Sequence, residues 1–122
     1  MRELSTIQKI GNLNKIYAYD ERGLGNANHL YRIDLHWEEP GGHILDYVEF
    51  QNGSRKDPES VSGVLDTDLL EIVRDRLIGF QSGDFASDDN AKALEHVEIA
   101  LIHLNKRAID RYDSNALCTY NK

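Results

Sequence analysis

The chain has 122 residues, of which 40% are hydrophobic, and it carries a formal net charge of −7. This length and apolar fraction suit one globular domain with a modest core and argue against wholesale disorder. The acidic balance argues against a DNA-binding or membrane-surface protein, which would need a broad basic face. A few arginines could still form a local positive pocket.

The cysteine content and the N-terminal residues indicate an intracellular, reducing setting. Cys118 is the single cysteine, so an internal disulfide is impossible, and no Cys/His cluster predicts zinc. The first residues lack the apolar segment of a signal peptide, and no apolar run reaches transmembrane length. We therefore expect a soluble cytoplasmic protein without a metal or cofactor.

Three segments in the first half of the chain predict a small antiparallel sheet, within about residues 15–50. Lys15–Tyr19 has the aromatic and β-branched bias of a strand. Leu30–Trp37 alternates apolar and polar residues, as in a half-buried strand, after a glycine- and asparagine-rich loop. Residues 43–50 form a third strand that pairs with the second as a hairpin, although Asp46 interrupts its alternation. Residues 1–13 are weakly patterned and predict no element.

The second half predicts two antiparallel helices. A polar loop over 51–63 leads to a helix over 66–78, with acidic residues in its first turn and Gly79 as its stop. Its apolar face consists of Leu69, Ile72, Val73 and Leu77. Ser87 and the following aspartates suit the start of a second helix, over about 88–112. Strands followed by helices indicate an α+β fold in one domain, with a strand-rich part (1–63) and a helical hairpin with a tail (64–122).

The second helix carries two apolar stripes at different angles. Leu94, Val97, Leu101, Leu104 and Ala108 form the first stripe, and Ile99, Ile102 and Ile109 form the second. The spacings of three and four residues place each stripe on one side of a helix. We therefore expect this helix to bury more than one side.

Two patterns that resemble functional motifs have simpler explanations. The segment from Gly23 to Asn28 resembles the start of a dinucleotide fingerprint, but it lacks the third glycine and precedes a strand instead of a helix. His96, His103 and Asp110 recur every seven residues on the long helix, which separates neighbours by about 10 Å and is too far for one metal ion. A hairpin loop and solvent-facing histidines account for both patterns.

A further set of residues favours recognition of an anionic nucleotide. Phe80 could stack on a base, and the amide of Asn90 matches the donor and acceptor of an adenine edge. Arg107 and Arg111 lie four residues apart on one helical face and could hold a phosphate, and Arg55 and Lys56 form a second cationic pair. The alternative is that Phe80 is a core residue between the helices and that the arginines pair with Glu98, Asp110 or Asp113.

Several segments along the chain carry a family resemblance. In the hairpin they are Leu77–Gly83, Phe85-Ala86, Asn90, Ala93-Leu94, Glu98–Leu101, Leu104, Arg107 and Asp110-Arg111. In the first part they are Lys15–Asp20, Gly25–His29, Tyr47–Gly53 and Gly63–Leu70. Together these segments resemble phage Thoeris anti-defence proteins of the first type, whose hairpin is shared with phage proteins that counter CBASS immunity.

The resemblance implies a protein that captures signals without catalysis. It would bind glycocyclic ADP-ribose, a cyclic ADP-ribose-type signal, and also cyclic trinucleotides, in the cytoplasm of the infected bacterium. Subunits would form homodimers and hexamers built as trimers of dimers, with pockets between subunits. Carried over by position, Phe80 stacks on adenine, Asn90 reads its edge, and Arg55, Arg107 and Arg111 hold phosphates.

Two other functions fit the same residues. An enzyme that degrades these signals would need a general base, for which His96, His103 and Glu98 are candidates. A protein-interaction module would use the two apolar stripes as docking surfaces.

Overall fold

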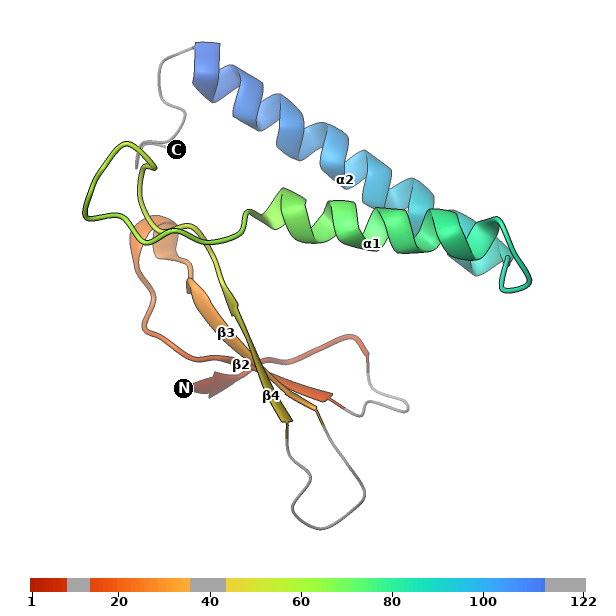
Figure 1. Cartoon of the computed structure of the whole chain (residues 1–122), viewed down its shortest axis with the longest axis horizontal. Helices are drawn as coiled ribbons and strands as arrows, with labels where there is room; N and C mark the ends of the chain where they lie inside the picture. The colour runs from red at the N-terminus through yellow and green to blue at the C-terminus, as the bar shows by residue number, and fades with distance from the viewer. Residues whose placement is uncertain (9–13, 36–43, 114–122) are drawn as a thin grey trace. The chain divides into compact units, whose positions relative to one another are not determined.

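The computed structural model describes residues 1–8, 14–35 and 44–113, with only the backbone for residue 24 and for residues 110–113. It confirms the α+β class, because a four-stranded antiparallel sheet is followed by two helices (Figure 1). The chain divides into two compact units, Met1–Gly63 and Val64–Lys122. Cys118 and the other residues of the polar tail lie outside the described residues.

The sheet has the strand order β1-β2-β3-β4, with each strand antiparallel to the next. Its strands are β1 (Arg2–Glu3), β2 (Asn14–Ala18), β3 (Leu30–Leu35) and β4 (Ile44–Glu49). The prediction missed β1, which is two residues long and pairs with the end of β2. The predicted continuation of β3 through His36 and Trp37, and the start of the next strand at His43, lie outside the described residues.

One face of the sheet carries the apolar alternation of β3. Ile33 pairs with Ile16 on one side and with Asp46 on the other. Paired residues of antiparallel strands point to the same side, so Asp46 shares the apolar face and explains the break in the pattern of β4. Ala18, on the same face beside Tyr31, is fully buried. The alternation predicted for the second strand is therefore confirmed over Leu30–Leu35.

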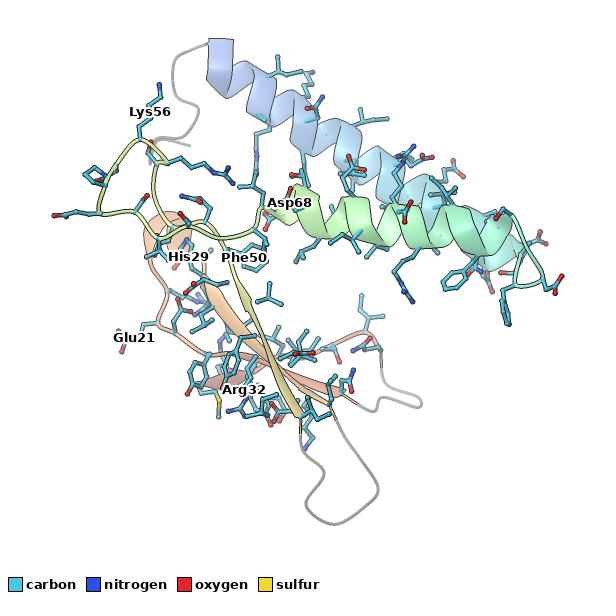
Figure 2. The ribbon with its side chains drawn as sticks, in the orientation of Figure 1. Glu21, His29, Arg32, Phe50, Lys56 and Asp68 are labelled. Carbon is cyan, nitrogen blue, oxygen red and sulfur yellow. The ribbon has the colours of Figure 1, made fainter. Side chains whose placement is uncertain are left out.

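The opposite face carries Arg32 (Figure 2), which lies beside tyrosine rings. Arg32 donates two hydrogen bonds to Asp34, at 2.7 and 3.1 Å, and the first of these raises the pKa of Arg32. Its guanidinium carbon lies 4.9 Å from the ring centre of Tyr17 and 5.6 Å from that of Tyr19, whose ring meets Tyr47 edge to face. This cation is satisfied within the sheet, because its carboxylate partner and two rings surround it.

The connection between β2 and β3 contains a single turn of 3-10 helix, η1 (Leu24–Asn26), where the sequence predicts only a loop. Gly25 (φ 71°) and Asn26 (φ 61°) adopt the left-handed conformation that these residue types tolerate. The connection leads into a strand, so no helix N-terminus is available for a pyrophosphate. The structure thus confirms that the glycines belong to a turn.

Asp20 anchors this connection to the sheet. Its carboxylate accepts hydrogen bonds from the backbone N–H of His29, at 3.1 and 3.2 Å, and from the side-chain amide of Asn28, at 3.2 Å. Asn28 is buried and also accepts a hydrogen bond of 2.9 Å from Arg2. Burial by itself raises the pKa of Asp20, but these hydrogen bonds outweigh it and lower the pKa below its ordinary value.

Residues 51–63 form a loop that is closed at its base. The backbone N–H and carbonyl groups of Asn52 and Val61 exchange two hydrogen bonds of 2.9 Å. Gly53 has a φ of 95°, which suits glycine. Arg55 and Lys56 are exposed, and Figure 2 shows Lys56 pointing away from the loop. The predicted loop thus presents both cations to solvent.

The second unit is a hairpin of α1 (Asp66–Gln81) and α2 (Asp88–Asp113). The helices meet near their short connection and diverge away from it (Figure 1). Arg74 of α1 donates a hydrogen bond of 2.8 Å to Glu98 of α2, which raises the pKa of Arg74. Gly79 was predicted to end the first helix, but the helix continues to Gln81 because a glycine within the last turn keeps helical hydrogen bonds.

The two apolar stripes of α2 have different environments. The first stripe, with Leu94, Leu101 and Leu104, is half-buried as predicted. The second is exposed: 65% of the surface of Ile102 is accessible, 51% of that of Ile109 and 42% of that of Ile99. In α1, Leu69 and Leu77 are half-buried, whereas Ile72 and Val73 are exposed. The prediction that α2 buries more than one side is therefore wrong for the single chain.

Candidate ligand-binding site

The connection between the helices is held by side chains that were expected to start α2. The hydroxyl of Ser87 accepts a hydrogen bond of 3.0 Å from the backbone N–H of Asn90, and so it caps the helix. The backbone N–H of Ser87 donates 2.8 Å to the side chain of Gln81, the last residue of α1. The end of α1 and the start of α2 are therefore tied together.

Phe80 lies at this end of α1 and is not a buried core residue, since 38% of it is exposed. Its ring centre lies 6.4 Å from that of Phe85, with the planes nearly perpendicular. The guanidinium carbon of Arg76 lies 5.4 Å from the centre of the Phe80 ring. Phe80 therefore offers part of an aromatic surface to a ligand, beside a cation.

Asn90 is linked to Phe80 through Phe85, a residue of the same connection. Its side-chain amide donates a hydrogen bond of 3.0 Å to the backbone carbonyl of Phe85. One amide hydrogen and the carbonyl oxygen Oδ1 have no partner among the described residues, although Asn90 is half-buried. The remaining N–H donor and the Oδ1 acceptor of Asn90 lie side by side, and an adenine edge complements such a pair.

Of the arginines predicted to hold phosphates, Arg107 lies far along α2 from this connection. Arg107 is exposed and follows Asn90 by 17 residues, which is about 25 Å along a helix. Arg111 belongs to α2, but its side chain is outside the described residues. Arg55 belongs to the other compact unit. Within the hairpin, Phe85 thus links Phe80 and Asn90 indirectly, whereas Arg107 lies further along α2.

The alternative interpretation paired the arginines with acidic residues of α2. Glu98, a predicted partner of Arg107, is instead bound to Arg74. Among the described side chains, Arg107 has no ion-pair partner. The side chains of Asp110 and Asp113, the other predicted partners, lie outside the described residues.

Comparison with known proteins identifies the hairpin. Residues 43–108, more than half of the chain, match the profile of the Acb2/Tad1 hairpin domain. The chain belongs to the Acb2/Tad1 hairpin family. It is also similar to the Thoeris anti-defense 1 protein of Bacillus phage SBSphiJ7, with 36% identity over 75 residues, which are 62% of this chain and 52% of that protein. The aligned segment spans about half the length of that relative, and the predicted resemblance to first-type Thoeris anti-defence proteins is confirmed.

The residues named as candidate catalytic bases are exposed or paired in this Acb2/Tad1 hairpin. His96 and His103 are exposed on α2, and Glu98 is engaged by Arg74. Among the described residues, no three His, Cys, Asp or Glu side chains gather as a metal site. In the same residues, no helix has both the length and the apolar character needed to cross a membrane.

Sequence reasoning missed two residues beside the candidate stacking ring of this Acb2/Tad1 hairpin. Arg76 precedes Phe80 by four residues on α1, a spacing that places both on one side of a helix and could have revealed it. Phe85 is 77% exposed and contacts Phe80. Its contact depends on the conformation of the connection, so spacing alone gives no signal for it.

Proposed function

We propose that this chain is an anti-defence protein that binds glycocyclic ADP-ribose and sequesters it without cleavage, so that Thoeris immunity is not activated. Membership of the Acb2/Tad1 family and the similarity to an anti-Thoeris phage protein support this assignment. The protein would act in the cytoplasm of the infected bacterium, where the signal is made. It would need no cofactor, DNA or membrane.

The observation that carries the proposal is the link between Phe80 and Asn90 through Phe85. Phe85 contacts the ring of Phe80 and accepts the hydrogen bond of Asn90 through its carbonyl. A purine stacked on Phe80 would therefore meet an amide whose orientation is already set. Preorganised polar groups reduce the entropy cost of binding, as a high-affinity capture protein requires.

We further propose that the complete pocket forms between subunits of a homodimer, which could assemble further into a hexamer. Arg107 is about 25 Å along the helix from Asn90, so one hairpin cannot place both on one small ligand. A second copy could bring its own Arg107, with Arg111 and Arg55, to the Phe80 end. The exposed stripe of Ile99, Ile102 and Ile109 offers an apolar surface for such an assembly.

Cyclic trinucleotides of CBASS immunity are a second proposed ligand class. The hairpin is the part of the chain that matches the shared Acb2/Tad1 domain. The arginines that do not contact glycocyclic ADP-ribose would serve the three phosphates of such a ligand. Competition between the two ligands tests this: separate sites predict simultaneous binding, and a shared site predicts displacement.

The deciding experiment is calorimetric titration with glycocyclic ADP-ribose, followed by heat denaturation of the complex and analysis of the released nucleotide. We expect saturable binding and recovery of intact ligand. An altered product would instead support an enzyme and direct attention to His103 and Glu98. Absence of binding to either ligand class would refute the nucleotide proposal and favour a protein-interaction module.

A further inference from the structure

Two arginines of α1 lie close in sequence but have different surroundings. Arg74 is bound to Glu98 at 2.8 Å and lies 3.9 Å from Glu71. Arg76 is exposed, and its guanidinium carbon lies 5.4 Å from the centre of the Phe80 ring. Among the described side chains, no carboxylate lies within ion-pair distance of Arg76. The hairpin thus leaves one cation uncommitted beside its candidate stacking ring.

The surroundings of Phe80 make this cation significant. The connection and the first turn of α2 carry three exposed aspartates: Asp84, Asp88 and Asp89. These carboxylates repel an anionic ligand brought to Phe80. Arg107 of the same chain is too far along the helix to offset them. Within one hairpin, Arg76 lies beside Phe80 and is placed to offset this repulsion.

We propose that Arg76 binds a phosphate of the nucleotide whose base stacks on Phe80. This inference rests on the proposed function and adds a fourth arginine to the expected site. A single ribose separates base and phosphate, so a base at the ring brings its phosphate within reach of an arginine one helical turn away. A charge-assisted, two-pronged hydrogen bond to phosphate is stronger than an exposed cation–π contact. The guanidinium therefore moves from the ring to the phosphate and exposes more of the ring to the base.

The proposal predicts that stacking and phosphate binding depend on each other. With the phosphate held by Arg76, the base is held near the ring of Phe80. With the base in place, the phosphate is held near the arginine. Loss of either side chain should therefore weaken the contribution of the other, and the double variant should lose less affinity than the product of the two single losses.

The test is calorimetric titration of glycocyclic ADP-ribose with the parent chain, Arg76→Gln, Arg76→Lys and the control Lys92→Gln. Lys92 is an exposed cation two residues from Asn90, and this spacing directs it to another side of α2. We expect Arg76→Gln to weaken binding roughly tenfold or more, which corresponds to at least one lost charge-assisted contact. Arg76→Lys should be intermediate, because it keeps the charge but loses the planar fork. Lys92→Gln should bind nearly as the parent does.

Three further readouts separate a phosphate contact from a structural role. The thermal unfolding midpoint of Arg76→Gln should match that of the parent, and its binding should depend less on salt concentration than the binding of Lys92→Gln. Phe80→Leu combined with Arg76→Gln should show the non-additivity described above. Equal affinity of Arg76→Gln and the parent, or equal losses in Arg76→Gln and Lys92→Gln, would overturn the inference and leave the proposed function standing. A parent chain that binds no nucleotide would overturn both.

Discussion

Phe80 and Asn90 are both proposed to contact the ligand, but they should contribute differently to the stability of the fold. Phe80→Ala should weaken binding of glycocyclic ADP-ribose by about 1–3 kcal/mol through loss of stacking, with little effect on folding, because the ring is already partly exposed. Asn90→Ala should weaken binding and also lower the free energy of unfolding by about 1 kcal/mol, because the Phe85 carbonyl loses its donor. Calorimetry and chemical denaturation give the two quantities.

Phe85→Ala is the matched control for the ring at position 80, since it removes a neighbouring phenylalanine that is more exposed. It should cost less affinity than Phe80→Ala. Equal losses for the two variants would contradict the assignment of stacking to Phe80. Unchanged stability in Asn90→Ala would show that the hydrogen bond to Phe85 contributes nothing to the hairpin.

Asp20 should make the sheet unit sensitive to acid. Its folded-state pKa is lowered below 3.8, so the ionised carboxylate stabilises the fold at higher pH. This contribution is fully present above the unfolded-state pKa and is lost as the pH falls through the folded-state pKa. We expect the free energy of unfolding to decrease when the pH is lower than about 4. Asp20→Asn should be less stable than the parent at pH 7, and its stability should depend less on pH over the acidic range. Equilibrium denaturation at several pH values measures both effects, and an identical pH profile for the variant would contradict the role.

At the scale of the elements, an added side chain should have opposite effects on stability at Gly79 and at Gly63. A Cβ added at Gly79, within α1, meets nothing within 4 Å, so Gly79→Ala should stabilise the hairpin by about 0.5–1 kcal/mol through helix propensity. A Cβ added at Gly63 would collide with the Glu49 carbonyl oxygen and come within 2.7 Å of the Gln51 nitrogen. Gly63→Ala should therefore destabilise the sheet unit by about 1–3 kcal/mol. Thermal unfolding of both variants checks the opposite signs.

The elements show which features a sequence can predict. Strands β2, β3 and β4 and both helices follow from periodicity and capping residues, because local patterns determine them. β1 could not be predicted, since two residues have no period and their pairing depends on β2. Gly79 misled the prediction because a glycine stops a helix only where the chain takes a left-handed turn, and here it does not.

The candidate site was predictable to a smaller extent. Phe80 and Asn90 were proposed from residue type and family resemblance, and each contacts Phe85 in the structure. Arg76 was overlooked although its four-residue spacing from Phe80 is visible in the sequence. The pairing of Arg74 with Glu98, which leaves Arg76 as the cation beside the ring, is a contact between helices that spacing does not specify. The positions of Arg55 and Arg111 relative to Phe80 remain predictions for the assembled protein.

At the scale of the whole molecule, the described residues bury little. Among them only Ala18 and Asn28 are buried, and Ile102 is 65% exposed on α2. We expect Ile102→Glu to shift the protein toward monomer, because a charge cannot be buried in an apolar interface without a partner. Light scattering coupled to size-exclusion chromatography measures the mass, with His96→Glu as the control at an exposed polar position. An unchanged oligomer in Ile102→Glu would place the interface elsewhere.

A pocket shared between subunits predicts complementation between inactive variants. Phe80→Ala and Arg107→Ala should each bind poorly alone. When they are mixed and allowed to exchange subunits, a two-fold dimer of one of each contains one intact pocket, so roughly a quarter of all sites should recover. Titration of the mixture with glycocyclic ADP-ribose counts these sites. Failure to recover sites despite verified subunit exchange would show that each pocket lies within one chain.

The bond from Asn90 to the Phe85 carbonyl also has a consequence for how the sequence can diverge. The acceptor belongs to the backbone, so any residue at position 85 can provide it, whereas the donor requires the Asn90 side chain. In a saturation mutagenesis library selected for nucleotide binding by folded protein, position 85 should accept a wide range of residues and position 90 very few. The exposed position 85 thus gives a lineage room to adjust the rim of the pocket while its amide stays in place.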